Sequence, residues 1–331
     1  MFVCRHDGDN PLMALGEFDL IQKYFTRAVQ RAALGVGDDC ALFAPSPGMQ
    51  LAVSSDMLVE GRHFLSTVSP ERLGHKALAV NLSDLAACGA RPLAFTLALA
   101  LPRADEVFLA GFSRGLLALA DAQGCELIGG DTTQGPLNIC ITVFGEVPAG
   151  QALLRSGAHA GDDIFVSGTL GDARLALEVF RGTLSLSGAD FDAVRPAMEC
   201  PQPRVALGQA LRDCAHSAID VSDGLLGDLS HILQRSGVGA TLDVDALPRS
   251  RVMRALPLAL QRETTLAGGD DYELVFTAAA DRSAQVQAAA AQAGVAVTCI
   301  GRIDAQAGLR LLDAAGQPVE QRFASFDHFR T

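Results

Sequence analysis

The order of strand-like and helix-like patterns constrains the fold of this chain more than any other feature of its sequence. Helical periodicity predicts helices over 17–29, 70–87, 106–122, 172–180, 204–214, 225–234 and 283–293. Strand patterns fall at 50–55, 94–101, 126–128, 137–147, 163–166, 217–221, 240–244, 272–277 and 297–303. The two kinds of element alternate without a regular strand–helix–strand rhythm. This order predicts an α+β or mixed α/β fold with mixed or antiparallel sheets, rather than a doubly wound parallel sheet.

The pattern is interrupted around 148–161, where proline and several glycines replace the hydrophobic periodicity. A chain of 331 residues is long enough for two domains of ordinary size. We therefore predict an N-terminal domain over 1–149 and a C-terminal α/β domain over 150–331. Tight turns are expected at 129–131 and at 168–171, and the second of these opens a helix whose N-terminus can accept an anion.

Aspartates recur where the predicted elements stop, mostly beside glycine or serine. They are Asp38, Asp39, Asp56, Asp84, Asp131, Asp220, Asp223, Asp270 and Asp271. Any one of them alone is explained as a turn former or a helix N-cap. Together, carboxylates at the ends of rigid elements can converge, and Mg²⁺ prefers such oxygen ligands together with phosphate oxygens. The sequence therefore predicts divalent cations, chiefly Mg²⁺, around the phosphate chain of a nucleotide.

Composition excludes several other classes of function. A net charge of −12 disfavours binding to a nucleic-acid backbone. Lys23 and Lys76 are the only lysines, and the absence of a GxxxxGK[ST] motif excludes a P-loop. The sequence also lacks GxSxG, HExxH and paired Cys/His zinc spacings. Eight scattered cysteines, no secretory signal and no apolar run of membrane-spanning length predict a cytoplasmic protein with reduced thiols and no membrane partner.

Eight short motifs follow one another between residues 35 and 274 of the chain. They are Gly-Val-Gly-Asp-Asp-Cys-Ala (35–41), Ser-Ser-Asp-Met-Leu-Val (54–59), Gly-Arg-His-Phe (61–64), Lys-Ala-Leu-Ala-Val-Asn-Leu-Ser-Asp-Leu-Ala-Ala (76–87), Gly-Gly-Asp-Thr-Thr (129–133), Arg-Ser-Gly-Ala (155–158), Ile-Asp-Val-Ser-Asp-Gly-Leu (219–225) and Gly-Gly-Asp-Asp-Tyr-Glu-Leu (268–274). Each is weak alone. In this order they resemble the thiamine-monophosphate kinase family over nearly the whole chain.

The resemblance implies transfer of the γ-phosphoryl group of ATP to thiamine monophosphate, which gives thiamine diphosphate. It implies direct in-line transfer assisted by several Mg²⁺ ions, without a phosphorylated residue. It also implies the two-domain fold of the aminoimidazole-ribonucleotide-synthetase-like superfamily. In that fold the N-terminal sheets pair across a homodimer to form a β-barrel, and ATP lies between the two halves of each subunit.

The same resemblance assigns roles to individual residues by motif. The implied metal ligands are Asp39, Ser54, Ser55, Asp56, Asp84, Asp131, Asp220 and Asp223. ATP contacts fall on Gly130, Asp131, Arg155 and Ser222, and thiamine monophosphate contacts fall on His63, Asp270 and Phe323. The family commonly has Glu at the position of Asp270 and Trp at that of Phe323, so this chain keeps an acid and an aromatic ring at these positions.

Two other classes of function are open to such a sequence. One is an ATP-dependent synthetase that activates a carbonyl or a selenide, although Cys4 lacks the glycine-rich context expected of its reactive residue. The other is a nucleotide-binding regulator without catalysis, which has no need for so many carboxylates. His63, taken alone, is also explained as a surface or packing residue.

Overall fold

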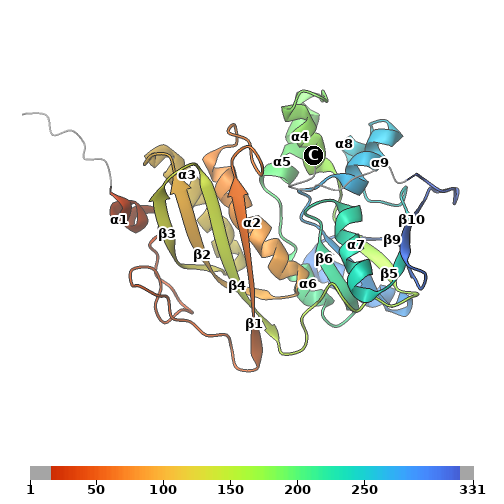
Figure 1. Cartoon of the computed structure of the whole chain (residues 1–331), viewed down its shortest axis with the longest axis horizontal. Helices are drawn as coiled ribbons and strands as arrows, with labels where there is room; N and C mark the ends of the chain where they lie inside the picture. Colours follow the sequence, from red (N-terminus) through yellow and green to blue (C-terminus); the bar gives the residue numbers. More distant parts are fainter. Residues whose placement is uncertain (1–15, 321–331) are drawn as a thin grey trace, which may run out of the picture.

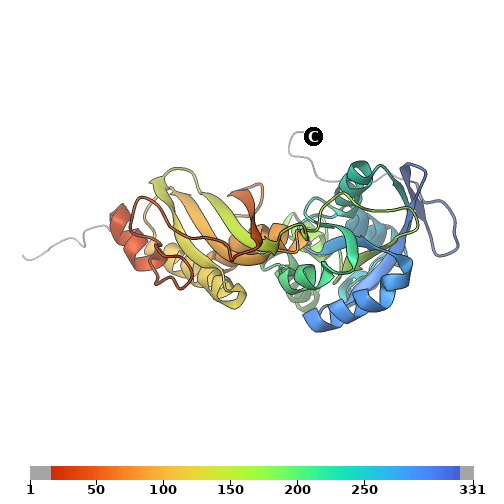
Figure 2. The ribbon, with the colours of Figure 1, turned by 90° about the horizontal axis from the view of Figure 1, so that it is seen from below.

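The computed structural model describes residues 16–320, which form two lobes built on separate β-sheets (Figure 1). Seen from below, the N-terminal lobe and the C-terminal lobe lie side by side (Figure 2). Their hydrophobic core is continuous, because residues of the N-terminal helices cluster with Val205, Leu207, Leu211, Leu274 and Phe276 of the C-terminal lobe. A contact surface between the lobes is therefore a place where side chains from both halves of the chain can meet.

The N-terminal sheet has four strands in the order β1 (Met49–Val59), β4 (Asn138–Pro148), β2 (Arg91–Leu101) and β3 (Glu126–Gln134). The β1–β4 and β4–β2 pairs are antiparallel, whereas β2 and β3 are parallel. Two long helices, α2 (Pro70–Ala87) and α3 (Glu106–Gln123), pack against one face and bury Leu97, Leu99 and Ile141. The sheet is mixed, as the order of elements predicted.

Helix α2 lies between the two lobes and begins and ends as its sequence predicts. The Ser69 side chain accepts the Arg72 amide as an N-cap, and Pro70 occupies the first helical position, where no amide donor is needed. Helix α2 ends before Gly89, which adopts a φ of 69°. Twelve of its residues are buried, which is typical of a helix covered on nearly all sides.

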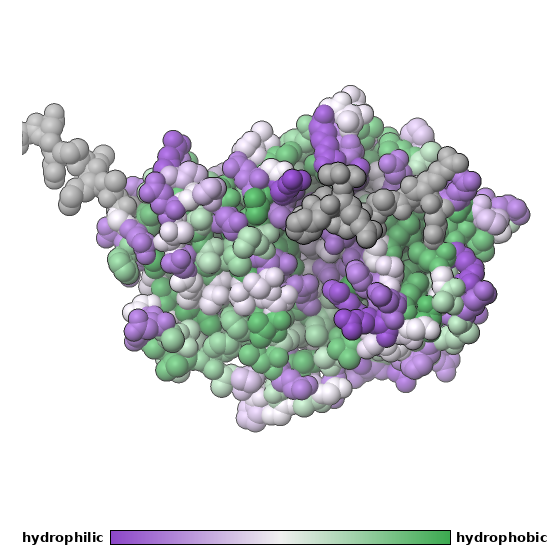
Figure 3. Space-filling view, in the orientation of Figure 1, coloured by the Kyte–Doolittle hydropathy of each residue, from purple (hydrophilic) through white to green (hydrophobic). Residues whose placement is uncertain are grey.

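The other face of the N-terminal sheet is open along β1. Leu51, Val53 and Met57 point to this face and are 42%, 56% and 53% exposed. Apolar surface lies over the region of β1 to β4 in the space-filling view (Figure 3). Near the far edge, the segment before β1 covers part of the same face through a Phe43–Phe144 contact, with ring centroids 5.3 Å apart. An open apolar face of this kind favours association with another protein surface.

The C-terminal sheet has six strands, and its helices pack around it. The strand order is β10 (Gly308–Leu312), β7 (Gly239–Asp243), β9 (Val297–Asp304), β5 (Asp163–Ser167), β8 (Leu274–Ala278) and β6 (Ala215–Asp220). Only the β10–β7 pair is parallel, so this sheet is mixed as well. The helices are α4 (Asp172–Phe180), α5 (Gly188–Glu199), α6 (Val205–Leu211), α7 (Leu225–Ser236), α8 (Arg251–Arg254), α9 (Leu258–Ala267) and α10 (Ser283–Ala293).

Several predicted boundaries were wrong. The helix expected over 17–29 is α1 (Glu17–Leu20) followed by a π-helical turn to Phe25, because Thr26 is extended. The segment 129–131 is not a turn, since β3 continues through it with a register shift against β2. Strand β1 does not stop at Asp56, because pairing with β4 continues to Val59. Helices α5, α8 and α9 and strand β10 were missed, as their short, polar or Pro-containing sequences carry little periodicity.

Within residues 16–320, no helix combines the length and the apolar character that crossing a membrane requires. A closed barrel is likewise absent from the described part of this single chain, whose N-terminal sheet is open.

Candidate active site

Side chains of α2 contact acidic segments from both lobes. Ser54 on β1 donates a hydrogen bond of 2.5 Å to the Asp84 carboxylate. One residue earlier on α2, Ser83 donates a bond of 2.7 Å to Asp220, the last residue of β6. Asp56 on β1 is tied to the same helix, because its backbone amide donates to the Asn81 side chain at 3.1 Å. Three acidic residues that are far apart in the sequence are therefore held around one helix.

The carboxylates of this cluster are close enough to disfavour one another's ionisation. Burial, followed by the negative charges of Asp84, Asp228 and Asp56, raises the pKa of Asp220 to about 7, although the Ser83 hydrogen bond lowers it. Burial also raises the pKa of Asp56 to about 6, with contributions from Asp84 and Asp223. The cluster carries more negative charge than its surroundings compensate, which is the environment that a bound cation would relieve.

A positively charged side chain, Arg155, lies near Asp84 and comes from the segment that joins the two sheets. Burial raises the pKa of Asp84, while the Ser54 hydrogen bond and the nearby Arg155 guanidinium both lower it. Arg155 is exposed and follows the Pro148 end of β4. An exposed guanidinium beside buried carboxylates can bind an anion such as a phosphate group.

The loop after β6 is shaped by a buried carboxylate. Asp228 on α7 accepts the backbone amides of Ser222, Asp223 and Gly224 at 3.0, 3.1 and 3.1 Å. Ser222 also accepts the amide of Asp270 at 2.8 Å through its carbonyl oxygen. The loop that carries Ser222 and Asp223 is therefore fixed beside the loop that carries Asp270.

Asp270 connects this loop to the one buried lysine. Its backbone has a φ of 67° and that of Tyr272 a φ of 50°, which are unusual for residues other than glycine. Tyr272 donates a hydrogen bond of 3.1 Å to one Asp270 oxygen, and Lys76 Nζ lies 3.2 Å from the other. The Lys76 side chain is only 2% exposed, and its Nζ makes this ion pair without hydrogen-bond geometry. A buried ammonium thus opposes part of the cluster's negative charge.

Three predicted metal ligands lie away from this cluster within the chain. The first is Asp131. It pairs with Ala98, which in turn pairs with Cys140, so Asp131 belongs with these two residues to the open face of the N-terminal sheet. Ser55 is on the same face, where its hydroxyl lies 3.0 Å from Thr142 Oγ1. The buried residues that alternate with them face the helices, as Asp56 does.

Asp39 is exposed in the loop before β1, where its amide donates to Asp38. Gly130 pairs with Leu97 at a φ of 149°, and a side chain there would place Cβ 1.9 Å from the Leu97 carbonyl oxygen. His63 accepts the Val59 amide at 3.0 Å through Nδ1, which leaves its proton on Nε2. Phe323 and Cys4 lie outside the described residues.

Sequence reasoning missed the residues that hold the carboxylates in place, namely Lys76, Asn81, Ser83, Asp228 and Tyr272. The signals for Lys76, Asn81 and Ser83 were present, because polar residues in the mostly apolar helix α2 are costly unless each has a partner. Asp228 gave no such signal, since an acid in the first turn of a helix is ordinary.

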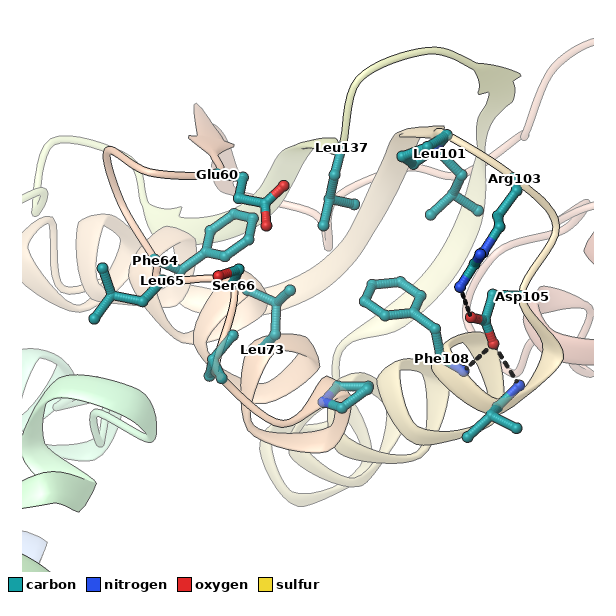
Figure 4. Close-up of a pocket in the computed structure, with 14 residues that line it drawn as sticks. Glu60, Phe64, Leu65, Ser66, Leu73, Leu101, Arg103, Asp105, Phe108 and Leu137 are labelled. Carbon is teal, nitrogen blue, oxygen red and sulfur yellow. Dashed lines mark hydrogen bonds and ion pairs between the residues drawn. The ribbon is translucent and has the colours of Figure 1, made fainter. Parts of the chain in front are cut away.

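A separate groove of about 540 Å³ lies in the N-terminal lobe, beside the first turns of α2 and α3 (Figure 4). Phe64, Leu73 and Phe108 line it together with polar groups from Glu60 and from the bonded pair Arg103–Asp105. None of the predicted site residues in the described part of the chain lines this groove. Its lining residues Glu60 and Phe64 lie on either side of His63 in the sequence, but no residue of the carboxylate cluster lines it.

Comparison with known proteins identifies first the class and then the family. Residues 37–147 match the N-terminal domain and residues 159–313 the C-terminal domain of AIR synthase related proteins. The chain therefore has the two domains of the AIR synthase related class. A thiamine-monophosphate kinase from Salmonella typhimurium is 47% identical over 326 residues, which covers 96% of this chain and 100% of that protein.

Solved structures of thiamine-monophosphate kinases are also similar to this chain. The crystal structure of thiamine-monophosphate kinase from Stenotrophomonas maltophilia has a TM-score of 0.82 at 47% identity, over 87% of this chain and 92% of that one. A ThiL protein complexed with AMPPCP and TMP has a TM-score of 0.75 at 30% identity, over 86% and 89% of the two chains. The chain belongs to the thiamine-monophosphate kinase family, a family of kinases that phosphorylate thiamine phosphate.

Proposed function

We propose that this protein transfers the γ-phosphoryl group of ATP directly to the phosphate of thiamine monophosphate, giving thiamine diphosphate and ADP. The observation that carries the proposal is the convergence of Asp56, Asp84 and Asp220 from β1, α2 and β6. Family membership and the relative that was crystallised with AMPPCP and TMP support the choice of both substrates. An acceptor phosphate oxygen attacks the γ-phosphorus, and the bond to the bridging oxygen of ADP breaks.

The carboxylate cluster fits a divalent cation. Buried acids whose pKa values are raised by one another's charge are stabilised when a cation joins them, and carboxylate and hydroxyl oxygens suit Mg²⁺. We propose that several Mg²⁺ ions are held by Asp39, Ser54, Ser55, Asp56, Asp84, Asp131, Asp220 and Asp223. When bound, Mg²⁺ would neutralise phosphate charge and reduce the repulsion between the two anionic substrates.

The chain's own residues would position these groups. Ser54 and Ser83 orient the Asp84 and Asp220 carboxylates, and the loop that Asp228 anchors presents Ser222. Gly130, Asp131, Arg155 and Ser222 are proposed to contact ATP, and position 130 requires glycine because a side chain there would clash with the Leu97 carbonyl oxygen of the neighbouring strand. His63, Asp270 and Phe323 are proposed to contact thiamine monophosphate.

The open face of the N-terminal sheet supports a homodimer. Pairing two such faces into a barrel would cover Leu51, Val53 and Met57, which are exposed in the single chain. Asp131 on the same face would then lie within the dimer rather than on a free surface. We also propose the domain division at 149/150 and a cytoplasmic location, which the seven unpaired cysteines among the described residues support.

A direct assay tests the proposed reaction. Purified full-length protein with ATP, Mg²⁺ and thiamine monophosphate should form thiamine diphosphate, measured by chromatography, and Asp84→Asn should abolish this while the exposed Asp213→Asn should not. Failure to form thiamine diphosphate would contradict the kinase proposal. ATP that is chiral at the γ-phosphorus tests the direct step, because a single in-line transfer inverts configuration and a phosphoenzyme retains it.

A further inference from the structure

Two histidines and a buried aspartate meet at the outer edge of the C-terminal sheet, outside the carboxylate cluster. His159 and His216 face each other with their Nδ1 atoms 3.3 Å apart, and His216 Nδ1 lies 2.9 Å from Asp162 Oδ2. The ligand atoms of all three residues lie within 4.8 Å of one another. We propose that these residues bind a divalent transition-metal ion of the zinc type.

The spacing of the two imidazole nitrogens fits coordination to one ion. Two nitrogens bound tetrahedrally to Zn²⁺ at roughly 2.0–2.1 Å stand roughly 3.3 Å apart. At this distance the two Nδ1 atoms cannot both direct an N–H group at each other. In a neutral pair, one Nδ1 atom therefore offers its lone pair on this side. His159 Nδ1 and Asp162 Oδ2 are 4.0 Å apart, and a small rotation of the exposed His159 side chain closes this gap.

Local backbone structure builds the site. His216 is the extra residue of a β-bulge in β6, which shifts register against β8 between Ala215 and Ser217. Bulges of this kind redirect a side chain out of the regular alternation. Gly157 passes so close to His216 that a Cβ there would lie 2.5 Å from the His216 carbonyl oxygen. The segment that carries His159 is thereby held against the strand that carries His216.

The carboxylate is fixed before any ion binds. The Asp162 side chain is 5% exposed and accepts the His159 amide at 2.9 Å, while the Asp162 amide donates to the His159 carbonyl at 3.0 Å. The Asp162 carbonyl accepts the Ile303 amide of β9 at 2.8 Å. His159 is largely exposed, so water can occupy the remaining coordination positions.

The chemistry of the donors selects the ion. Imidazole nitrogens suit Zn²⁺, Ni²⁺ or Co²⁺, whereas Mg²⁺ prefers oxygen ligands. Along β6, His216 precedes Asp220 by four residues, which corresponds to roughly 13 Å of strand. The site is therefore distinct from the Asp56–Asp84–Asp220 cluster, and a bound ion would join the segment between the sheets to the edge strand.

The test is a calorimetric titration, in which ZnCl₂ is added to metal-free, full-length protein in the presence of saturating Mg²⁺. The exposed thiols Cys40 and Cys299 are replaced by serine in every sample, because they would compete for zinc. We expect one equivalent to bind with micromolar affinity and to weaken at about pH 5.5, because imidazole must be deprotonated to ligate. His159→Ala and His216→Ala should each weaken binding at least about tenfold.

The matched control is His231→Ala, which removes an exposed histidine of α7. It should bind zinc as the parent does. Equal affinity in the His159→Ala and His231→Ala proteins, or no binding by the parent, would overturn the proposal. His159 is exposed, so its replacement should not perturb folding, which circular dichroism checks. Anomalous diffraction from a zinc-soaked crystal should show the ion between the two Nδ1 atoms, and a peak elsewhere would contradict the site. None of these outcomes depends on kinase activity.

Discussion

Replacing Asp220 by Asn should stabilise the metal-free protein and at the same time remove much of its response to Mg²⁺. Asp220 is 5% exposed, and its pKa is raised from 3.8 to about 7, first by burial and then by Asp84. A carboxyl with a raised pKa in the folded state holds its proton more tightly there than in the unfolded chain. The native state is therefore favoured below pH 4, and this stability is lost as the pH rises to about 7.

The size of this effect follows from the difference in pKa. About three pH units at about 1.4 kcal/mol each amount to about 4 kcal/mol against folding at pH 8, an effect that Asp220 shares with the neighbouring Asp84 charge. Asn cannot ionise, yet its carbonyl oxygen can still accept the Ser83 hydroxyl. Asp220→Asn should therefore raise the melting temperature at pH 8 in EDTA by several degrees, and the gain should shrink towards pH 4.

Thermal unfolding of both proteins at pH 4.5 and pH 8, in EDTA and in millimolar Mg²⁺, checks this reasoning. Mg²⁺ should stabilise the wild type through binding to the native state and should stabilise the variant much less. The control is Asp213→Asn, an exposed residue just before β6, which should unfold like the wild type in every buffer. A variant that is less stable than the wild type at pH 8 without metal would refute the argument from charge.

Three further predictions concern single contacts. Asp270→Asn leaves the buried Lys76 ammonium without its carboxylate, so the free energy of unfolding, measured in denaturant, should fall by about 3 kcal/mol. Adding Lys76→Met to the same protein should largely restore it, and no restoration would mean that the ion pair is not the cause. Asp131→Asn should lower kcat at least about tenfold. The melting temperature without metal should be unchanged, because Asn keeps the size of the side chain and Asp131 is not part of the packed core of the single chain; unaltered kinetics across a Mg²⁺ titration would refute its proposed role. Phe323→Ala should raise the KM for thiamine monophosphate far more than that for ATP, and equal increases would show that the ring does not touch the thiamine.

The sequence predicted those elements whose ends carry strong local signals. Helices α2, α4 and α10 have the predicted bounds, because proline, capping residues or glycine mark their ends. Strand ends were less predictable: pairing with β4 extends β1 beyond Asp56, and a register shift lets β3 pass through Gly129 and Gly130. Such pairings depend on a distant strand, which no local pattern contains.

The same distinction applies to the site. Convergence of the aspartates as a group was predicted from the chemistry of carboxylates, and of these the structure brings Asp56, Asp84 and Asp220 together. Which face of the sheet Asp131 occupies was not predictable, because a shift of one residue in pairing reverses the direction of every side chain. The register shift between β2 and β3 decides that question.

One helix relates all of the carboxylate contacts to one another. On α2, Lys76 lies beside Asp270, Asn81 accepts the Asp56 amide, Ser83 binds Asp220 and Asp84 accepts from Ser54. These four positions span little more than two helical turns, so their spacing is fixed by helical geometry rather than by the loops that bring in the partners. Because α2 also packs into the core of both lobes, the charge repulsion within the cluster acts against the helix on which both sheets depend. A cation bound at the cluster would therefore relieve repulsion on the helix against which both lobes pack.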